Sequence, residues 1–457
     1  MKKTYQKKLL QKIPGGSHTY SRGFDQFPSN APEILSQGKD CYMYDQNKNK
    51  FIDYGMGLRS SILGYSNNFV NRNAIKEIQN GNNLSLPTLT EFNAANKITQ
   101  TIKSAEMVKF AKTGSAAVTA AIKIARAYNG KDMILKCQND PFYSYDDWFI
   151  SDTKMKLGVP KVFKKFTLNF QYNDFEGLEK IIKNYKKKIS CLIMEGSNTA
   201  HPKILNEKNK NVINKNNYKS VKEYYKKNNH FLKFVQKICN QNNIVFILDE
   251  MITGFRWSLG GAQEFYNINP DISTFGKAMA NGYSVSAVVG KKKFMKLGSI
   301  EEKGKKRLFL LSSTHGAEMS SLGAMIATIK FLKEKKVSEK IWDYGVEMKN
   351  SFNKLSKQFG LEKYLYIDGV PCSPFYVTKN KRFKNSLIMR TIFHQEMIKN
   401  KIFIPWISIS YSHSREILKK TLKASEKAMI VYKKALKFGA KKYLNGNVIK
   451  PVFRKYN

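Results

Sequence analysis

The chain has 457 residues, 42% of them hydrophobic, which is enough to bury a large core and predicts one large and one smaller domain. Lysine and arginine number 79 against 35 acidic residues, and the formal charge of +44 at pH 7 raises nucleic-acid binding as a first hypothesis. The lysines, however, run from Lys2 to Lys455 without a basic helix interleaved with aromatics or a zinc-finger spacing. This distribution favours solvated surface charge and predicts no specific nucleic-acid partner.

The five cysteines are widely spaced and contain no Cys-x-x-Cys pair, so neither a disulfide framework nor a metal site is predicted. The basic N-terminus leads into no long apolar segment, and no run of residues approaches the length that crosses a membrane. We therefore expect a cytoplasmic protein without a membrane partner.

The first 65 residues are expected to form an N-terminal segment that contributes to the small domain, with a large domain over 66–320 and the rest of the small domain over 321–457. Residues 1–13 alternate basic and apolar side chains and predict a short helix, which the sequence Pro14-Gly15-Gly16 ends. Residues 34–64 predict a β-meander followed by a loop, and 68–86 a polar helix.

A candidate phosphate cradle follows the apolar strand predicted at 107–111. Gly114 and Ser115 stand between that strand and a helical pattern over 118–128. Small residues at such a junction leave backbone amides free, and the helix dipole favours an anion there. The same pair of residues also caps many ordinary helices, so this signal alone is weak.

Two further predicted strands end near residues of interest. The strand at 133–137 leads to an aromatic stretch that begins at Phe142, and the strand at 189–194 ends at Glu195. The stretch from Phe142 indicates either a ring that stacks on a ligand or an aromatic core cluster. Residues 197–233 are rich in Lys and Asn and predict a surface insertion with a short helix. A helix at 231–241 follows.

The centre of the chain is the continuous apolar run 244–248, which predicts a strand buried on both faces and ends on Asp249 and Glu250. Lys277 lies between glycine and alanine, and no other lysine occurs from 243 to 289. An amine in a tight, partly apolar turn has a lowered pKa and can attack an aldehyde, while a buried carboxylate needs a cationic partner. Pyridoxal 5'-phosphate supplies both an aldehyde and a pyridinium nitrogen. The alternative is that the carboxylates cap a turn and Lys277 is solvated.

The rest of the chain predicts strands at 284–290 and 307–312, with Thr314 just after the second. A helix over 322–335 then leads to a C-terminal part with helices at 338–359, 387–399 and 416–438 and short strands such as 375–377.

Two motifs carry a family resemblance. Residues 249–256 read Asp-Glu-Met-Ile-Thr-Gly-Phe-Arg and 276–277 read Gly-Lys, which resemble the Asp-Glu-Val-x-Thr-Gly-Phe-Arg and Gly-Lys signatures of class III pyridoxal-phosphate-dependent aminotransferases. The resemblance covers nearly the whole chain except 197–233 and the tail after 440. It implies fold type I of these transferases: an α/β large domain with a mostly parallel seven-stranded sheet flanked by helices, a smaller α+β domain, and residues 1–65 at the active-site mouth.

The resemblance also implies residue roles. Lys277 would form the Schiff base with the cofactor and Asp249 would hold its pyridine nitrogen. The remaining expected contacts are cofactor residues Gly114, Ser115, Phe142, Met251 and Thr314, and substrate residues Arg22 and Glu195. Because relatives bring the threonine into the partner subunit's phosphate site, Thr314 implies a homodimer with shared active sites.

The substrate is less well defined. The Pro-Gly-Gly turn with Arg22 eight residues after Pro14 resembles glutamate-1-semialdehyde 2,1-aminomutases, which move an amino group within one substrate to give 5-aminolevulinate. Ala116 replaces a usual glutamate, and residues 316–318 and 405–410 depart from the pattern of relatives. The alternative is an external aminotransferase for a keto or aldehyde substrate, for instance in surface-polysaccharide biosynthesis. A basic binding protein on a degenerate scaffold is the hypothesis of another class, and the intact Asp249 and Lys277 argue against it.

Overall fold

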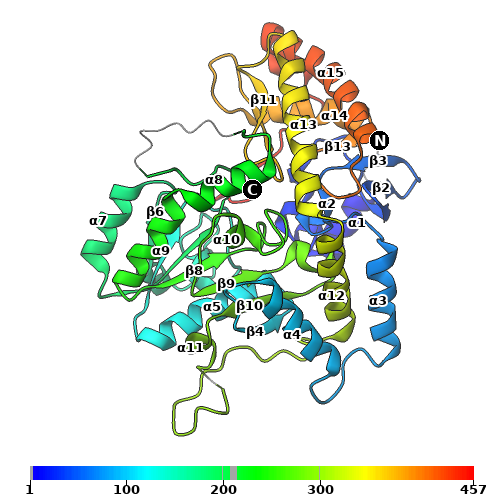
Figure 1. The fold of residues 1–457 in the computed structure, drawn as a ribbon. Helices are drawn as coiled ribbons and strands as arrows, with labels where there is room; N and C mark the ends of the chain where they lie inside the picture. Colours follow the sequence, from blue (N-terminus) through cyan, green and yellow to red (C-terminus); the bar gives the residue numbers. More distant parts are fainter. Residues whose placement is uncertain (1–3, 198, 206–213, 298, 457) are drawn as a thin grey trace. The chain divides into compact units, whose positions relative to one another are not determined.

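The computed structural model describes residues 4–197, 199–205, 214–297 and 299–456. The chain forms two compact units: Met1–Asn67 with Lys340–Asn457 in unit 1, and Asn68–Glu339 in unit 2. Figure 1 traces the chain in sequence colours. The first division lies close to the boundary expected after residue 65, whereas the second lies well beyond residue 320.

Unit 2 is built around a sheet of seven strands in the order β4-β10-β9-β8-β7-β5-β6. β10 runs antiparallel to β4 and β9, and all other neighbouring pairs are parallel. The predicted mostly parallel, seven-stranded α/β sheet is therefore confirmed. The strands are β4 (Met107–Ala111), β5 (Met133–Cys137), β6 (Thr167–Phe170), β7 (Ile189–Glu195), β8 (Val245–Asp249), β9 (Ile272–Phe275) and β10 (Ser286–Gly290).

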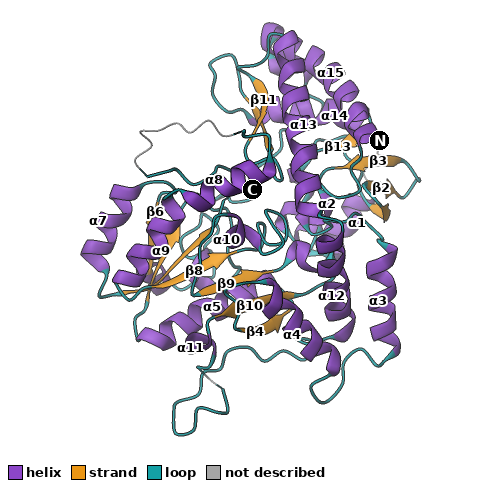
Figure 2. Ribbon diagram, viewed as in Figure 1, coloured by secondary structure: helices purple, strands orange, loops and turns teal. Residues whose placement is uncertain are grey.

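Helices enclose this sheet, as Figure 2 shows. Every residue of β7, β8 and β9 is buried, because helices cover the central strands on both sides. α5 (Gly114–Asn129) packs along five of the strands, α9 (Phe231–Gln241) on β8 and α7 (Phe175–Tyr185) on β6. β7 and β8 end side by side, so Glu195 lies next to Asp249 in register.

The long helix α12 (Met319–Glu334) explains the position of the second division. It packs against α3 (Asn68–Gln79) and α4 (Leu89–Thr101), so it belongs to unit 2 and not to the C-terminal unit. The shorter elements of unit 2 are α6 (Asp147–Ile150), α8 (Tyr218–Lys227), α10 (Gly261–Phe265), α11 (Lys292–Met295), η4 (Lys161–Phe166) and η5 (Lys277–Ala280).

The predicted insertion at 197–233 contains the expected short helix, α8, although residues 198 and 206–213 lie outside the described part of the chain. It is more than a surface loop. Tyr218 is buried and its hydroxyl donates to the Trp257 carbonyl at 2.9 Å, while Lys222 pairs with Glu264 of α10. The insertion is therefore anchored to the segment that follows β8.

Unit 1 is a smaller α+β unit, as predicted. The expected meander is the antiparallel set β1, β2 and β3, and β13 adds to β3 in parallel. α14 and α15 pack on each other, and Met43, Phe51 and Ile398 form part of the core. The elements are α1 (Thr4–Lys12), η1 (Pro14–Gly16), η2 (Tyr20–Arg22), η3 (Phe24–Gln26), β1 (Leu35–Lys39), β2 (Tyr42–Asp45), β3 (Lys50–Asp53), α2 (Met56–Arg59), β11 (Leu365–Asp368), β12 (Phe375–Thr378), α14 (Leu387–Lys399), β13 (Ile402–Phe403), α15 (Arg415–Phe438) and η6 (Ala440–Tyr443); α13 (Val337–Gln358) spans the second division.

Two predicted elements are wrong in extent or kind. The strand expected at 307–312 is irregular chain, with Phe309 73% exposed, and no strand in the described part of the chain pairs with it. The helix expected over 68–86 ends at Gln79, just before the turn at Gly81, whose φ is +104°. None of the described helices is both long and apolar enough to cross a bilayer.

Candidate active site

The carboxylate of Asp249 is buried where β8 ends. Asp249 is 2% exposed, and its Oδ1 accepts hydrogen bonds from the Met251 amide at 2.9 Å and the Thr274 hydroxyl at 3.1 Å. Burial raises the pKa of Asp249 to about 6, and the nearby Lys277 ammonium acts in the opposite direction. A cation placed against this carboxylate would stabilise its charged form.

Lys277 begins the tight turn η5 directly after β9, the strand next to β8. Its φ is +44°, a left-handed conformation that residues with a Cβ rarely adopt. The turn is closed by a hydrogen bond from the Met279 amide to the Gly276 carbonyl at 3.0 Å. Strained backbone of this kind is typical of functional sites. The charge of Lys277 acts to lower the pKa of Asp249, which indicates that the amine lies near the carboxylate.

Met251 links this pair to the predicted phosphate cradle. A Cβ added at Gly276 would lie 2.7 Å from Met251 Sδ, and one added at Gly114 would lie 2.9 Å from the same atom. The thioether therefore packs between the start of α5 and the turn before Lys277. Three motifs that are far apart in the sequence thus meet at one side chain.

The N-terminus of α5 has the form of an anion cradle. Thr113 is its N-cap and accepts the amide of Ala116 at 3.2 Å. Among the described residues the amides of Gly114 and Ser115 make no hydrogen bond. Ser286 of the adjacent strand donates to the Thr113 carbonyl at 2.7 Å and holds this turn in place. Unused amides at a helix start are what a phosphate requires.

The loop between β5 and α6 closes on the cradle. The amide of Tyr145 donates to Ser115 Oγ at 3.2 Å, and the Tyr145 hydroxyl lies 3.4 Å from Thr113 Oγ1. Phe142, which is expected to stack on a cofactor ring, is 44% exposed and packs edge-on against Phe149, with ring centroids 5.6 Å apart. The loop therefore offers an exposed phenyl face near the helix start.

Glu195 lies at the end of β7 and is 3% exposed. Its amide donates to Asp140 Oδ2 at 2.8 Å, and the hydroxyl of buried Tyr143 donates to the same oxygen. The Asp140 carboxylate adds to the rise in the pKa of Asp249. Asp140 thus ties the aromatic loop to the end of the sheet and contributes negative charge to the site.

Glu250 has a different task from Asp249, although the two are adjacent in the sequence. Its fully buried carboxylate accepts the amides of Ala262 at 2.9 Å and Gln263 at 2.8 Å, at the start of α10. Burial raises the pKa of Glu250 to about 7. It stabilises the backbone that follows β8 and does not face the other residues of the site.

Arg22 and Thr314 are the remaining predicted site residues. Thr314 is exposed in a turn between the irregular segment 307–312 and α12. Arg22 belongs to unit 1, where it ends η2 and lines a cavity of about 550 Å³ together with Tyr65 and Trp406.

Several site residues escape the sequence analysis: Asp140, Tyr145, Thr113 and Thr274. Only Thr274 carries a local signal, since it is a hydroxyl residue in a fully buried strand three residues before Lys277. Among the described residues no group of three or more His, Cys, Asp or Glu side chains is placed to hold a metal ion.

The arrangement fits pyridoxal phosphate. A protonated ring nitrogen would match the buried Asp249 carboxylate, and the phosphate would match the amides at the start of α5. Met251 and Phe142 would offer apolar surface to the ring. Lys277 would supply the amine that the aldehyde requires.

Known proteins are similar in sequence over most of the chain. The sequence profile of the family "Aminotransferase class-III" matches residues 26–365. A 3-aminobutyryl-CoA aminotransferase of Cloacimonas acidaminovorans is 29% identical over 430 residues, which covers 93% of this chain and 96% of the relative. A glutamate-1-semialdehyde 2,1-aminomutase of Methanobrevibacter smithii is 30% identical over 451 residues, covering 92% and 96%.

Solved structures share the fold. The FumI protein of Sphingopyxis sp. MTA144, determined with PLP, superposes with a TM-score of 0.80 at 19% identity and covers 95% of this chain and 97% of its own. A β-phenylalanine aminotransferase from Variovorax paradoxus gives a TM-score of 0.73 at 16% identity, covering 92% and 91%. Because the family profile spans most of the residues and the site fits the cofactor, the chain belongs to the class III aminotransferases, which are pyridoxal-phosphate-dependent enzymes.

Proposed function

We propose that this enzyme moves the amino group of a substrate that carries a free carboxylate, as glutamate-1-semialdehyde 2,1-aminomutases do when they form 5-aminolevulinate. The observation that carries the proposal is Arg22. Its guanidinium is exposed, lines the unit 1 cavity and makes no ion pair with any described residue. A five-donor planar fork of this kind is well shaped for a carboxylate.

The turn before Arg22 has a demanding backbone. Gly15 and Gly16 have φ values of +72° and +74°, and a Cβ at Gly16 would lie 2.6 Å from the ring of Phe24. Only glycine satisfies both the conformation and the space at Gly16. The Pro-Gly-Gly sequence that resembles the aminomutases therefore shapes the chain that leads to Arg22.

The proposed catalytic roles follow from the unit 2 geometry. Pyridoxal phosphate, when bound, supplies an aldehyde and a ring that withdraws electrons from the reacting carbon. Asp249 keeps a proton on the ring nitrogen through its buried carboxylate, which Met251 and Thr274 orient. Lys277 Nζ takes a proton from the substrate carbon that bears the amino group and returns it during transfer. Gly114 and Ser115 hold the phosphate with their amides.

Glu195 is proposed to approach the substrate from the end of β7, because it stands beside Asp249 in register. Thr314 is proposed to act in the site of a second subunit, because it is exposed in a turn at the place where relatives bring a threonine into the partner subunit's phosphate site. This gives a homodimer with shared active sites. Sedimentation equilibrium of the purified protein tests whether the protein is a dimer.

The second candidate is an external aminotransferase, and the same unit 1 cavity supports it. Phe403 and Trp406 line that cavity with Arg22, so it offers large apolar surfaces beside the guanidinium. The 3-aminobutyryl-CoA aminotransferase matches the chain as widely as the aminomutase does. A carboxylate substrate with an apolar portion would use both features.

The substitution Arg22→Ala is expected to raise KM for glutamate 1-semialdehyde roughly tenfold to a hundredfold, because a bidentate charge-assisted contact is lost. Arg22→Lys keeps the charge but not the fork and should recover only part of the affinity. The exposed Arg72 on α3 provides the control, and Arg72→Ala should leave KM unchanged. Steady-state kinetics on glutamate 1-semialdehyde and on donor and keto-acid pairs separate the two candidates. If the wild type does not convert glutamate 1-semialdehyde, the aminomutase proposal is contradicted and the external aminotransferase is favoured.

Two threonine N-caps allow a matched test of the phosphate cradle. Thr113 caps α5 and Thr88 caps α4 in the same way. Each hydroxyl oxygen accepts a hydrogen bond from a backbone amide, that of Ala116 and that of Glu91 respectively. Replacing either with alanine should lower the free energy of unfolding by about 1 kcal/mol. Only Thr113→Ala should also weaken pyridoxal phosphate binding, because only that cap orders the amides of the cradle. Urea denaturation and cofactor titration give the two readouts, and equal cofactor affinity in both variants would argue against the cradle.

A further inference from the structure

A strongly basic cavity lies wholly within unit 1, and Arg22 does not line it. It has a volume of about 340 Å³, and its walls come from β2, β3, β13, the turn before β13 and helix α15. Its lining residues are Tyr42, Lys50, Ile52, Asn400, Lys401, Ile402, Lys420, Lys423, Ala424 and Lys427. Half of them are lysines and none is acidic.

These lysines lack close ion-pair partners, although a carboxylate lies near the cavity: burial raises the pKa of Tyr42, and Glu416 adds to that rise. Among the described residues none of the five forms an ion pair, although other lysines do, such as Lys291 with Asp271 at 2.6 Å. Glu416, one turn before Lys420 on α15, makes no ion pair with it. Several cations along one cavity repel one another, and a bound anion would reduce this cost.

The chain holds these lysines at defined places. Lys420, Lys423 and Lys427 are spaced by three and four residues on α15, so they share one helix face at a cost of like-charge repulsion. Ala424, between them, leaves room for the cavity. Lys50 lies over the ring of Tyr42 with its Nζ 3.7 Å from the centroid, which positions the ammonium on the opposite wall.

Lys401 completes the wall in an unfavourable backbone conformation. Its φ is +63°, where glycine or asparagine would be relaxed, and its carbonyl accepts the Ile52 amide at 2.9 Å. Its Nζ lies 3.3 Å from Asn49 Oδ1. A cation is thus retained at a position where the backbone favours a different residue.

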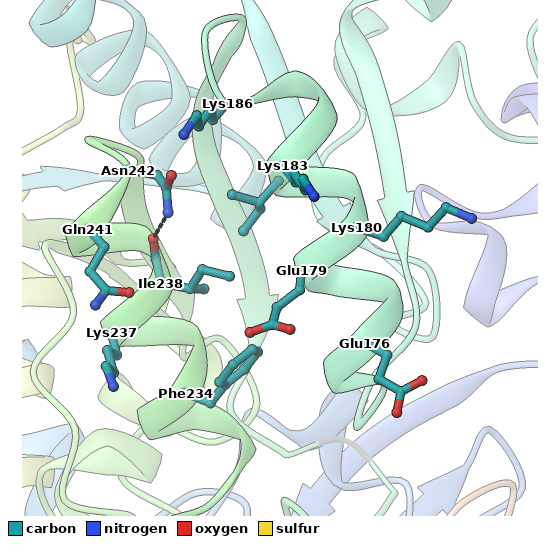
Figure 3. Close-up of a pocket in the computed structure, with 11 residues that line it drawn as sticks. Glu176, Glu179, Lys180, Lys183, Lys186, Phe234, Lys237, Ile238, Gln241 and Asn242 are labelled. Atoms are coloured by element: carbon teal, nitrogen blue, oxygen red, sulfur yellow. Dashed lines mark hydrogen bonds between the residues drawn. The ribbon is translucent and has the colours of Figure 1, made fainter.

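The basic cleft between α7 and α9 in unit 2 is different in kind. Figure 3 shows Lys180 and Lys186 pointing away from each other, and Glu179 lying near Phe234. Glu176 also lines that cleft. Its lysines diverge and share the surface with carboxylates, whereas the lining of the unit 1 cavity contains no acidic residue.

We propose that the lysine cavity of unit 1 binds a compact polyanion with two or more linked phosphate groups. Lysines from β3 and α15 on the cavity lining can match several phosphate charges at once, and the volume suits a small ligand. The proposal is independent of the amino-transfer site, because it uses none of its residues. The phosphates could belong to an inorganic chain or to a nucleoside triphosphate, and two probes separate these sources.

The test is calorimetric titration of the holoenzyme, whose own phosphate cradle is filled, with inorganic tripolyphosphate and with adenosine triphosphate at physiological salt. The pocket variant is Lys420→Gln/Lys423→Gln/Lys427→Gln. The control is Lys419→Gln/Lys433→Gln/Lys434→Gln, which removes the same charge from exposed positions of the same helix. A second pocket variant, Lys50→Gln/Lys401→Gln, tests the opposite wall without changing α15.

We expect saturable binding of tripolyphosphate with one site per chain in wild type and control, weakened on the order of a hundredfold in the triple pocket variant. Equal affinity for both probes would assign recognition to the phosphates, and tighter adenosine triphosphate binding would add the nucleoside. The proposal is overturned by the absence of saturable binding or by equal weakening in pocket and control variants. It is also overturned if a single-stranded RNA binds more tightly than tripolyphosphate and loses affinity equally in both triple variants, since this would indicate general surface charge.

Discussion

Replacing Lys277 with alanine is expected to lower kcat by roughly ten-thousandfold or more, because the variant loses both the amine that tethers the cofactor and the group that moves the substrate proton. Borohydride reduction of the wild-type holoenzyme followed by peptide mapping should place the pyridoxyl label on Lys277. In Lys277→Ala the label should disappear, while the cofactor should still bind without a covalent tether. The absorption spectrum and the kcat of the variant give two independent readouts.

Two lysines of the same unit serve as controls. Lys291 pairs with Asp271, and Lys112 pairs with Glu318 at 2.6 Å close to the start of α5. Lys291→Ala should lose that ion pair but retain the label and most of the activity. Lys277→Arg should keep the charge that opposes the rise in the pKa of Asp249 yet lack the nucleophile, so it should be nearly as inactive as the alanine variant. A label on Lys112 or Lys291 in the wild type would contradict the assignment.

The residues of the site that the sequence predicts are those with a strong local pattern. Asp249 ends a continuous apolar run, and Lys277 is isolated among small residues in a chain rich in lysine. Gly114 and Ser115 stand at a strand-to-helix junction that the sequence also reveals. The roles of these residues stay predictions, but the structure brings them together around Met251.

The residues that the sequence does not reveal act across long separations in the chain. The Asp140 carboxylate accepts a hydrogen bond from the Glu195 amide, and the Tyr145 amide donates a hydrogen bond to the Ser115 hydroxyl. No local periodicity encodes such contacts, since they depend on which strand ends become neighbours in the sheet. The same limit explains the wrong strand at 307–312, because an apolar run forms a strand only where a partner strand is present.

The insertion shows a third limit. Its Lys and Asn content predicts an exposed segment, because such polar side chains do not form a hydrophobic core. Tyr218, Val221 and Tyr225, however, recur along one face of α8 and are buried. A few apolar residues at helical spacing thus outweigh the average composition, because burial of one face is enough to dock a helix.

The substitution Asp249→Asn is expected to lower kcat roughly a hundredfold to ten-thousandfold with the cofactor still bound, because a neutral amide no longer keeps the ring nitrogen protonated. The asparagine oxygen can still accept the hydrogen bonds from Met251 and Thr274, so the fold should persist. Asp271→Asn is the matched control, since Asp271 is also buried in unit 2 but pairs with Lys291. It should lose stability and retain kcat.

The pH dependence gives this prediction a readout independent of turnover. In the cofactor-free protein the pKa of Asp249 is raised from 3.8 to about 6, so its contribution to stability is fully present below the unfolded value and is lost as the pH rises through about 6. A protonated ring nitrogen stabilises the charged carboxylate and removes that loss. Cofactor affinity should therefore increase as the pH rises through about 6 in the wild type, and the increase should be smaller in Asp249→Asn. Cofactor titrations of both proteins on either side of that pH measure the difference, and parallel profiles would show that Asp249 does not face the ring.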